Sequence, residues 1–393
     1  MLEAPRANRR RTQVSPETLR TVSLTAFILL LMVYPVFDRL FHFGAMGSMN
    51  PILIYVILAL GLNIVVGFAG LLDLGYAAFF AIGGYTVAFL TSPSSPLPFR
   101  TDFWAAMVAS WFVAALFGVI LGAPTLRLRG DYLAIVTLAF GEIVPRVFLN
   151  LEQWTRGSKG MSPIGRPHMP WVEESESGPV LVEKQLFATD QVLWYYLIFL
   201  IGALSVFIIV RLRDSRLGRA WMAMREDEVA AASAGIDLVQ TKLLACALGA
   251  SFSGFGGSLF ASMLQFIDPF QFQFDISIMV LSMVILGGIG NVWGVIFGGV
   301  AMGAFNLILA EQATGWLRAL GYAVGLPFLQ TADLSASKFL IYGLALVLMM
   351  LLRPEGIFPN RQRQAEMHAE VEEAAEVGPG EELVPERPVG TRA

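Results

Sequence analysis

The 35 residues from Ile276 to Ala310 read ISIMVLSMVILGGIGNVWGVIFGGVAMGAFNLILA and contain no charged side chain. As a single helix they would measure about 52 Å, because each residue of an α-helix adds about 1.5 Å. The hydrocarbon core of a bilayer is only about 30 Å thick. We therefore expect two membrane spans here, separated by a break in the helix at Gly287, Gly288, Gly290 and Asn291.

Similar apolar runs recur along the chain. Of its 393 residues, 55% are hydrophobic and 15% are charged, whereas soluble proteins carry about 25% charged residues. This balance, with a mean hydropathy of +0.63, excludes an ordinary soluble enzyme. The sequence predicts an all-α protein, a polytopic transmembrane helical bundle of about ten spans. The other nearly charge-free runs are Thr21–Phe37, Ile52–Leu72, Gly75–Leu90, Phe103–Leu126, Gln191–Val210, Leu243–Ile267 and Phe339–Leu352, with a weaker run at Tyr132–Asn150.

Lysine and arginine gather on one side of the membrane when the N-terminus is placed in the cytoplasm. With ten crossings, the inside segments hold 18 of these residues and the outside segments hold 8. Because cytoplasmic loops are normally richer in Lys and Arg, we expect both termini to be cytoplasmic. The expected parts are a basic arm at 1–20, a membrane domain at 21–359 with an outside loop at 151–190 and a cytoplasmic loop at 211–242, and a disordered acidic tail at 360–393.

Side chains that support metal or covalent chemistry are scarce. Cys246 is the single cysteine, and the histidines at positions 42, 168 and 368 stand far apart. A metal site needs several such ligands together. No nucleophile is paired with a base, and no GxxxxGKS or GxxxxGKT phosphate loop occurs. We therefore expect no catalytic residue, metal or cofactor on this chain, and no nucleic acid partner.

Two glycine-rich clusters interrupt the apolar runs. The first holds Gly83, Gly84 and Tyr85, and the second is the break from Gly287 to Asn291. Glycine-interrupted helices at corresponding places in two halves point to transport sites, so both clusters are candidates for a translocation pathway. Small residues also let helices pack closely in lipid, and the second cluster can equally be a short cytoplasmic turn. The sequence leaves these alternatives open.

Glu142 and Arg146 are ionisable residues inside an apolar run. Being four residues apart, they share one face of a helix. Such residues usually turn away from lipid and often mark a pathway, which makes Glu142 a pathway candidate. A structural ion pair is the alternative. Asp73 faces the same choice, because it lies between two runs and can simply cap a helix at the membrane surface.

The predicted cytoplasmic loop reads RLRDSRLGRAWMAMREDEVAAASAGIDLVQTK from Arg211 to Lys242. Leu217, Trp221 and Met224 recur at helical spacing, and small residues fill the run from Val229 to Gly235. A short helix with small residues can dock into a groove of a partner protein. An amphipathic helix whose arginines contact anionic lipid is the alternative.

Four stretches resemble the permease subunits of bacterial ABC importers for branched-chain amino acids. They occur in order between Ile52 and Pro359. They are LLDLGYAAFFAIGGY (Leu71–Tyr85), LRGDYLAIVTLAFGEIVPR (Leu128–Arg146), SRLGRAWMAMREDEVAAASAGI (Ser215–Ile236, with KLLACALGASFSGFGGSLFA after it) and ILGGIGNVWG (Ile285–Gly294).

The resemblance implies ATP-driven uptake of leucine, isoleucine or valine across the bacterial inner membrane. The implied partners are a second homologous permease, two cytoplasmic ABC ATPases that bind ATP and Mg²⁺, a periplasmic amino-acid-binding protein and membrane lipid. The cytoplasmic loop would couple ATP hydrolysis to transport, although Val229 separates Glu228 from the alanines of the family signature and the usual downstream proline is missing. The coupling candidates are Gly218, Arg225, Glu226, Asp227, Glu228, Ala230, Ala231 and Gly235.

Two other functions remain open from the sequence. A permease for urea or short amides would share this architecture. An ATP-independent secondary carrier or channel is the second alternative, although few carboxylates lie inside the spans to form a proton or sodium relay.

Overall fold

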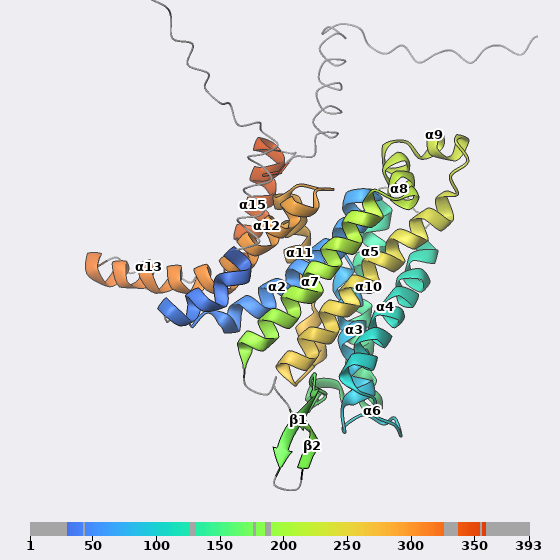
Figure 1. Cartoon of the computed structure of the whole chain (residues 1–393). Coiled ribbons are helices and arrows are strands. Elements are labelled where there is room, and N and C mark those ends of the chain that lie inside the picture. Colours follow the sequence, from blue (N-terminus) through green and yellow to red (C-terminus); the bar gives the residue numbers. More distant parts are fainter. Residues whose placement is uncertain are drawn as a thin grey trace, which may run out of the picture.

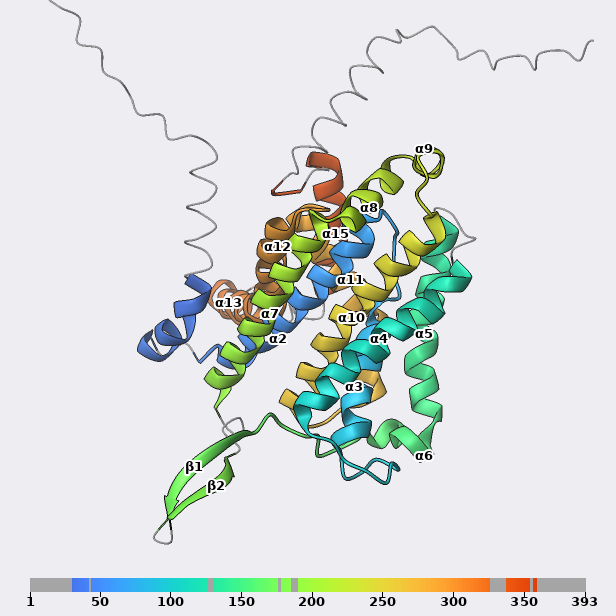
Figure 2. The ribbon, with the colours of Figure 1, turned by 45° about the vertical axis from the view of Figure 1, so that its right-hand side comes forward.

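The computed structural model describes residues 30–41, 44–125, 131–175, 178–184, 190–325, 337–353 and 356–358 (Figure 1). The predictions for the basic arm at 1–20 and the acidic tail at 360–393 lie outside these residues. The described part is a bundle of long helices, and most of them run roughly side by side (Figures 1 and 2).

Seven helical segments among the described residues are long and apolar enough to cross a membrane. The all-helical fold of the membrane domain is therefore confirmed, whereas the count of about ten spans is not. Two shorter apolar helices are α3 (Tyr76–Thr91) and α15 (Lys338–Leu352). The seven segments contain α2 with the π-helical turn η1 (Met46–Leu62, Asn63–Phe68), α4 (Phe103–Thr125), α5 (Asp131–Asn150), α7 (Gln191–Arg213), α10 (Leu238–Leu264), the 3-10 turn η3 with α11 (Pro269–Phe272, Phe274–Gly287) and α12 with η4 (Val292–Ala304, Phe305–Leu309).

The predicted break in the longest apolar run is confirmed. Helix α11 ends at Gly287 and α12 begins at Val292. Gly288 and Gly290 have φ angles of +111° and +82°, a region that side-chain-bearing residues rarely occupy. Asn291 then starts α12, because its side-chain oxygen accepts hydrogen bonds from the first-turn N–H groups of Trp293 and Gly294.

Helix α10 packs between α3 and α4 through small residues. A Cβ at Gly83 of α3 would lie 2.6 Å from the carbonyl oxygen of Gly254 of α10. The same carbonyl accepts a 2.7 Å hydrogen bond from the Ser110 hydroxyl of α4. Close backbone approach and hydrogen bonds between helices are what hold helices together in lipid, where the hydrophobic effect is absent.

The segments outside the bundle lie at its two opposite ends (Figure 1). At one end are α6 (Glu152–Thr155) and an antiparallel hairpin of β1 (Met169–Ser175) and β2 (Gly178–Lys184). At the other end are α8 (Arg216–Glu226) and α9 (Glu228–Ser233). The hairpin is an addition to the predicted all-α class, and it lies within the predicted outside loop at 151–190. Helix α13 (Ala310–Val324) leaves the bundle sideways (Figure 1).

Candidate functional site

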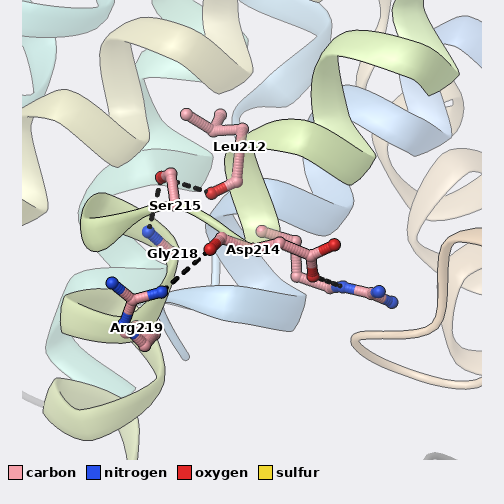
Figure 3. A network of polar contacts seen from close by, with 6 residues as sticks. Leu212, Asp214, Ser215, Gly218 and Arg219 are labelled. Atoms are coloured by element: carbon pink, nitrogen blue, oxygen red, sulfur yellow. Dashed lines mark hydrogen bonds and ion pairs between the residues drawn. The ribbon is translucent and has the colours of Figure 1, made fainter.

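The corner between α7 and α8 is closed by a network of short polar contacts (Figure 3). The Ser215 hydroxyl donates to the Leu212 carbonyl at 2.6 Å and accepts from the Gly218 N–H at 3.3 Å, which caps α8. Arg219 donates to the Asp214 carbonyl at 2.9 Å. A Cβ at Gly218 would overlap the carbonyl oxygen of Arg213. The predicted coupling residue Gly218 thus permits a tight corner.

Helix α8 is also anchored to the membrane helices. The Trp221 side chain is fully buried, and its Nε1–H donates to the Thr241 carbonyl of α10 at 2.8 Å. The Arg225 Nη1 donates to the Gly67 carbonyl of η1 at 2.6 Å. A displacement of α8 would therefore act directly on both α10 and the end of α2.

Helix α9 combines a fixed inner face with an open outer face. Asp227 caps it by accepting from Val229 N–H at 2.7 Å and Ala230 N–H at 3.0 Å. Glu228 pairs with Lys242 of α10 at 2.5 Å, where the Lys242 side chain is only 9% exposed. Of the other predicted coupling residues, Ala231 is buried, whereas Glu226, Asp227, Ala230 and Gly235 are exposed beside Val229. The outer face therefore presents small side chains at the end of the bundle.

The break between α11 and α12 lies at this same end. The Gly290 N–H donates to Asn63 Oδ1 of η1 at 2.9 Å, and Asn291 Nδ2 donates to the Phe358 carbonyl at 2.8 Å. A Cβ at Gly290 would lie 3.5 Å from the Arg225 guanidinium. The structure thus brings Gly290, in the break that holds Gly287, Gly288 and Asn291, next to Arg225 of the coupling candidates, a neighbourhood that the sequence alone does not reveal.

The first glycine cluster faces α10 within the chain. Gly84 is close enough for a Cβ to lie 3.3 Å from the Gly257 carbonyl oxygen. Tyr85 is buried, with its ring centroid 4.3 Å from that of Phe148 on α5. The Tyr85 hydroxyl has no hydrogen-bond partner among the described residues. Gly83, Gly84 and Tyr85 therefore lie at helix contacts, and their place on a pathway stays a prediction.

Glu142 lines a cleft of about 540 Å³ between α5 and the start of α11, the α5–α11 cleft. Glu142 accepts a hydrogen bond from Arg146 at 3.2 Å. Asp275, on the opposite wall, was not singled out in the sequence, because only the fold brings it close to α5. The cleft is lined by Glu142, Pro145, Arg146, Leu149, Pro269, Phe270, Gln273, Phe274 and Asp275.

Asp73 lies on the connection between η1 and α3. Its side chain is buried and accepts from the Gly75 N–H at 2.9 Å. Burial raises the pKa of Asp73 to about 6, against the lowering effect of that hydrogen bond. Asp73 shares a small pocket with Thr137, Lys242 and Cys246, below α9. Within the described ranges, no three His, Cys, Asp or Glu side chains gather as a metal site would require.

Comparison with known proteins gives the family. Residues 44–317 match the family described as branched-chain amino acid transport system, permease component. The chain is 38% identical to the LivM permease protein of Salmonella typhimurium and 37% identical to that of Escherichia coli K12, each over 88% of this chain and 78% of the relative. It is 23% identical to LivH of Salmonella typhimurium, over 77% of this chain and 90% of LivH. No solved structure matches significantly. The chain therefore belongs to the family of branched-chain amino acid transport permeases.

Proposed function

We propose that this chain is the permease subunit of an ABC importer that carries branched-chain amino acids across the bacterial inner membrane. The relatives of highest identity described above are named as high-affinity branched-chain amino acid transport permeases. The observation that carries the proposal is the anchoring of α8 and α9, because these helices present an open face while being fixed to α10 and η1. A carrier without an ATPase would have no need for such a segment.

The exposed face of α9 is the docking surface for the ATPases. Small side chains at Ala230 and Gly235 let a partner approach the backbone closely, and Val229 supplies an apolar contact that is 71% exposed. ATP and Mg²⁺ bind to the ATPases and not to this chain. When the ATPases close, α8 moves with them, and Trp221 and Arg225 transmit the displacement to α10 and η1. The break between α11 and α12 moves with this group, because Gly290 is bonded to η1.

The other end of the bundle meets the remaining partners. With the Lys and Arg bias of the sequence, α8 and α9 face the cytoplasm, and the loop at 151–190 with the β1–β2 hairpin faces the periplasm. A periplasmic amino-acid-binding protein delivers substrate to that loop. A second, homologous permease completes the pore. Both termini of the chain are cytoplasmic in this arrangement.

Purification of the tagged chain from its native membrane in mild detergent tests the proposal. We expect two ATPases and a second permease to co-purify with the wild-type chain. Ala230→Lys places a charge on the docking face and should release the ATPases, as should Glu228→Lys, which removes the partner of Lys242. Glu152→Lys, an exposed change at the opposite end, is the matched control and should retain them.

Recovery of the chain alone in every case would contradict the proposal and favour a secondary carrier. Competition for uptake separates the remaining alternative, because urea would block transport by an amide permease, whereas leucine would block the importer proposed here.

A further inference from the structure

The α5–α11 cleft follows α5 from its middle to its Asn150 end, beside the start of α11. Glu142 is the twelfth of the 20 residues of α5, which places it about 16 Å from one end of the helix and about 12 Å from the other. Only 17% of the Tyr132–Asn150 span is buried within the chain, compared with 89% of Met46–Phe68. Among the seven long spans of the described residues, α5 therefore has the smallest share of buried residues.

Charged groups on this outward face do not suit lipid. The Arg146 side chain is 75% exposed and the Glu142 side chain is 42% exposed. Ionisable residues within a membrane span normally face protein or a water-filled path. Glu142, Pro145, Arg146 and Leu149 recur every three or four residues, so they form one continuous stripe of α5 along the cleft. This stripe puts an anionic and a cationic side chain along one wall of the cleft.

The opposite wall adds a second carboxylate and apolar surface. Asp275 lies in the first turn of α11 and forms no ion pair within the part of the chain that the structure describes. Phe270 and Phe274 flank it in the lining of the cleft. The cleft thus offers two anionic groups, one cationic group and an apolar patch within about 540 Å³, which is within the range of small-molecule sites, about 300–1,000 Å³.

We propose that the α5–α11 cleft binds the zwitterionic backbone of the transported amino acid, an inference that rests on the proposed function. Glu142 and Asp275 accept hydrogen bonds from the substrate ammonium group. Arg146 donates two parallel hydrogen bonds to the substrate carboxylate, the geometry for which a guanidinium is suited. The branched side chain packs against Phe270 and Phe274.

The ion pair between Glu142 and Arg146 fits this role. Arg146 and Glu142 form an ion pair at 3.2 Å. On binding, each exchanges this internal partner for one end of the zwitterion, so Glu142, Arg146 and both substrate charges stay paired. Asp275 supplies the additional negative charge that favours the ammonium end on its side of the cleft.

Leucine uptake by the complete transporter, reconstituted in liposomes with its second permease, ATPases and binding protein, tests the inference. Glu142→Gln, Arg146→Gln and Asp275→Asn should each lower uptake by about tenfold or more, because a charge-assisted hydrogen bond to the substrate is lost. ATP hydrolysis stimulated by the binding protein should persist, which would show that each variant is folded and assembled. Asp268→Asn is the matched control, since Asp268 caps η3 near the cleft and does not line it.

The double variant that exchanges the two charges, Glu142→Arg with Arg146→Glu, separates substrate binding from a structural role. The exchange keeps an ion pair four residues apart on α5, but it reverses the polarity offered to the zwitterion. We expect uptake to stay low in this variant. Wild-type uptake in the exchange variant, or in the three single variants, would overturn the inference. Failure of the wild-type transporter itself to import leucine would instead overturn the proposed function.

Discussion

Lys242 and Asp73 are two buried ionisable residues beneath α9. Lys242 is neutralised by Glu228, and removing Glu228 would leave the buried Lys242 ammonium without its ion-pair partner. Glu228 therefore holds α9 in position from within, while Ala230 lies on the outer face. In the co-purification experiment, Glu228→Lys therefore tests the position of α9, whereas Ala230→Lys tests the docking surface itself.

Asp73 should make the stability of the protein depend on pH. Burial raises its pKa from 3.8 to about 6, so the folded protein binds this proton more tightly than the unfolded chain does. The stability that Asp73 contributes is fully present below about pH 4, and it is lost as the pH rises to about 6. The loss amounts to about 3 kcal/mol, because each pKa unit corresponds to about 1.4 kcal/mol.

Asp73→Asn removes the titration and retains a side-chain oxygen that can accept from the Gly75 N–H. We expect this variant to unfold at a higher temperature than the wild type at pH 8, with a smaller difference at pH 5. Thermal unfolding in detergent at the two pH values measures this. A difference that is the same at both would show that Asp73 does not titrate between them.

The sequence predicts Glu142 and Arg146 as partners because their spacing on one helix determines their distance. Asp275 could not be predicted in the same way. It lies 133 positions after Glu142 in the chain, and only the packing of α11 beside α5 places both on the walls of one cleft. The spacing along α5 therefore predicts the wall that holds Glu142 and Arg146, whereas the wall that holds Asp275 depends on tertiary packing.

Glycines have two different structural roles between the helices. Gly288 and Gly290 allow the chain to turn between α11 and α12, through φ angles that other residues rarely adopt. Gly83 instead has ordinary helical geometry, and it is the absence of a side chain that brings α3 against α10. The first role follows from backbone conformation, and the second follows from the distance between helices.

Gly83→Ala should therefore destabilise the bundle, because the new methyl group would press on the Gly254 backbone, which cannot move aside easily. Overpacking of this kind costs about 1–3 kcal/mol. Gly343→Ala in α15 is the matched control, since a Cβ there meets nothing within 4 Å. The midpoint of thermal unfolding in detergent should fall for Gly83→Ala and not for Gly343→Ala. An equal effect of both would exclude the close contact as the cause.

Helix positions were predictable because the length and the polarity of each run determine whether it can span lipid. The break at Gly287 to Asn291 is an example, since its position follows from the length of the run and the glycines within it. The β1–β2 hairpin was not predicted. Its two short strands, MPWVEES and GPVLVEK, lack the sustained alternation of apolar and polar residues that predicts a strand.

The number of crossings is a property of the whole molecule. Charge bias favours ten, whereas length and composition identify seven long spans and the shorter helices α3 and α15. With 16 and 15 residues, these two helices measure about 24 and 22 Å, which is less than the thickness of a hydrocarbon core. The ten-span arrangement requires both to cross the membrane, together with the predicted first span at Thr21–Phe37, which the structure describes only from Leu30 onward. This arrangement places α8 and α9 in the cytoplasm and α6 in the periplasm.

Cysteine labelling tests this orientation, because Cys246 is the single cysteine of the chain and Cys246→Ser provides a cysteine-free background. In that background, Glu152→Cys in α6 and Ala232→Cys in α9 place one exposed thiol at each end of the bundle. A membrane-impermeant maleimide added to cells whose outer membrane has been made permeable should label Glu152→Cys. It should label Ala232→Cys only after the inner membrane is opened.

The reverse pattern would place α9 in the periplasm, out of reach of any ATPase, and would exclude the coupling role. Labelling of both thiols without opening the inner membrane would place α6 and α9 on the same side. Because α7 is the one predicted span between them, this result would mean that α7 does not cross the membrane.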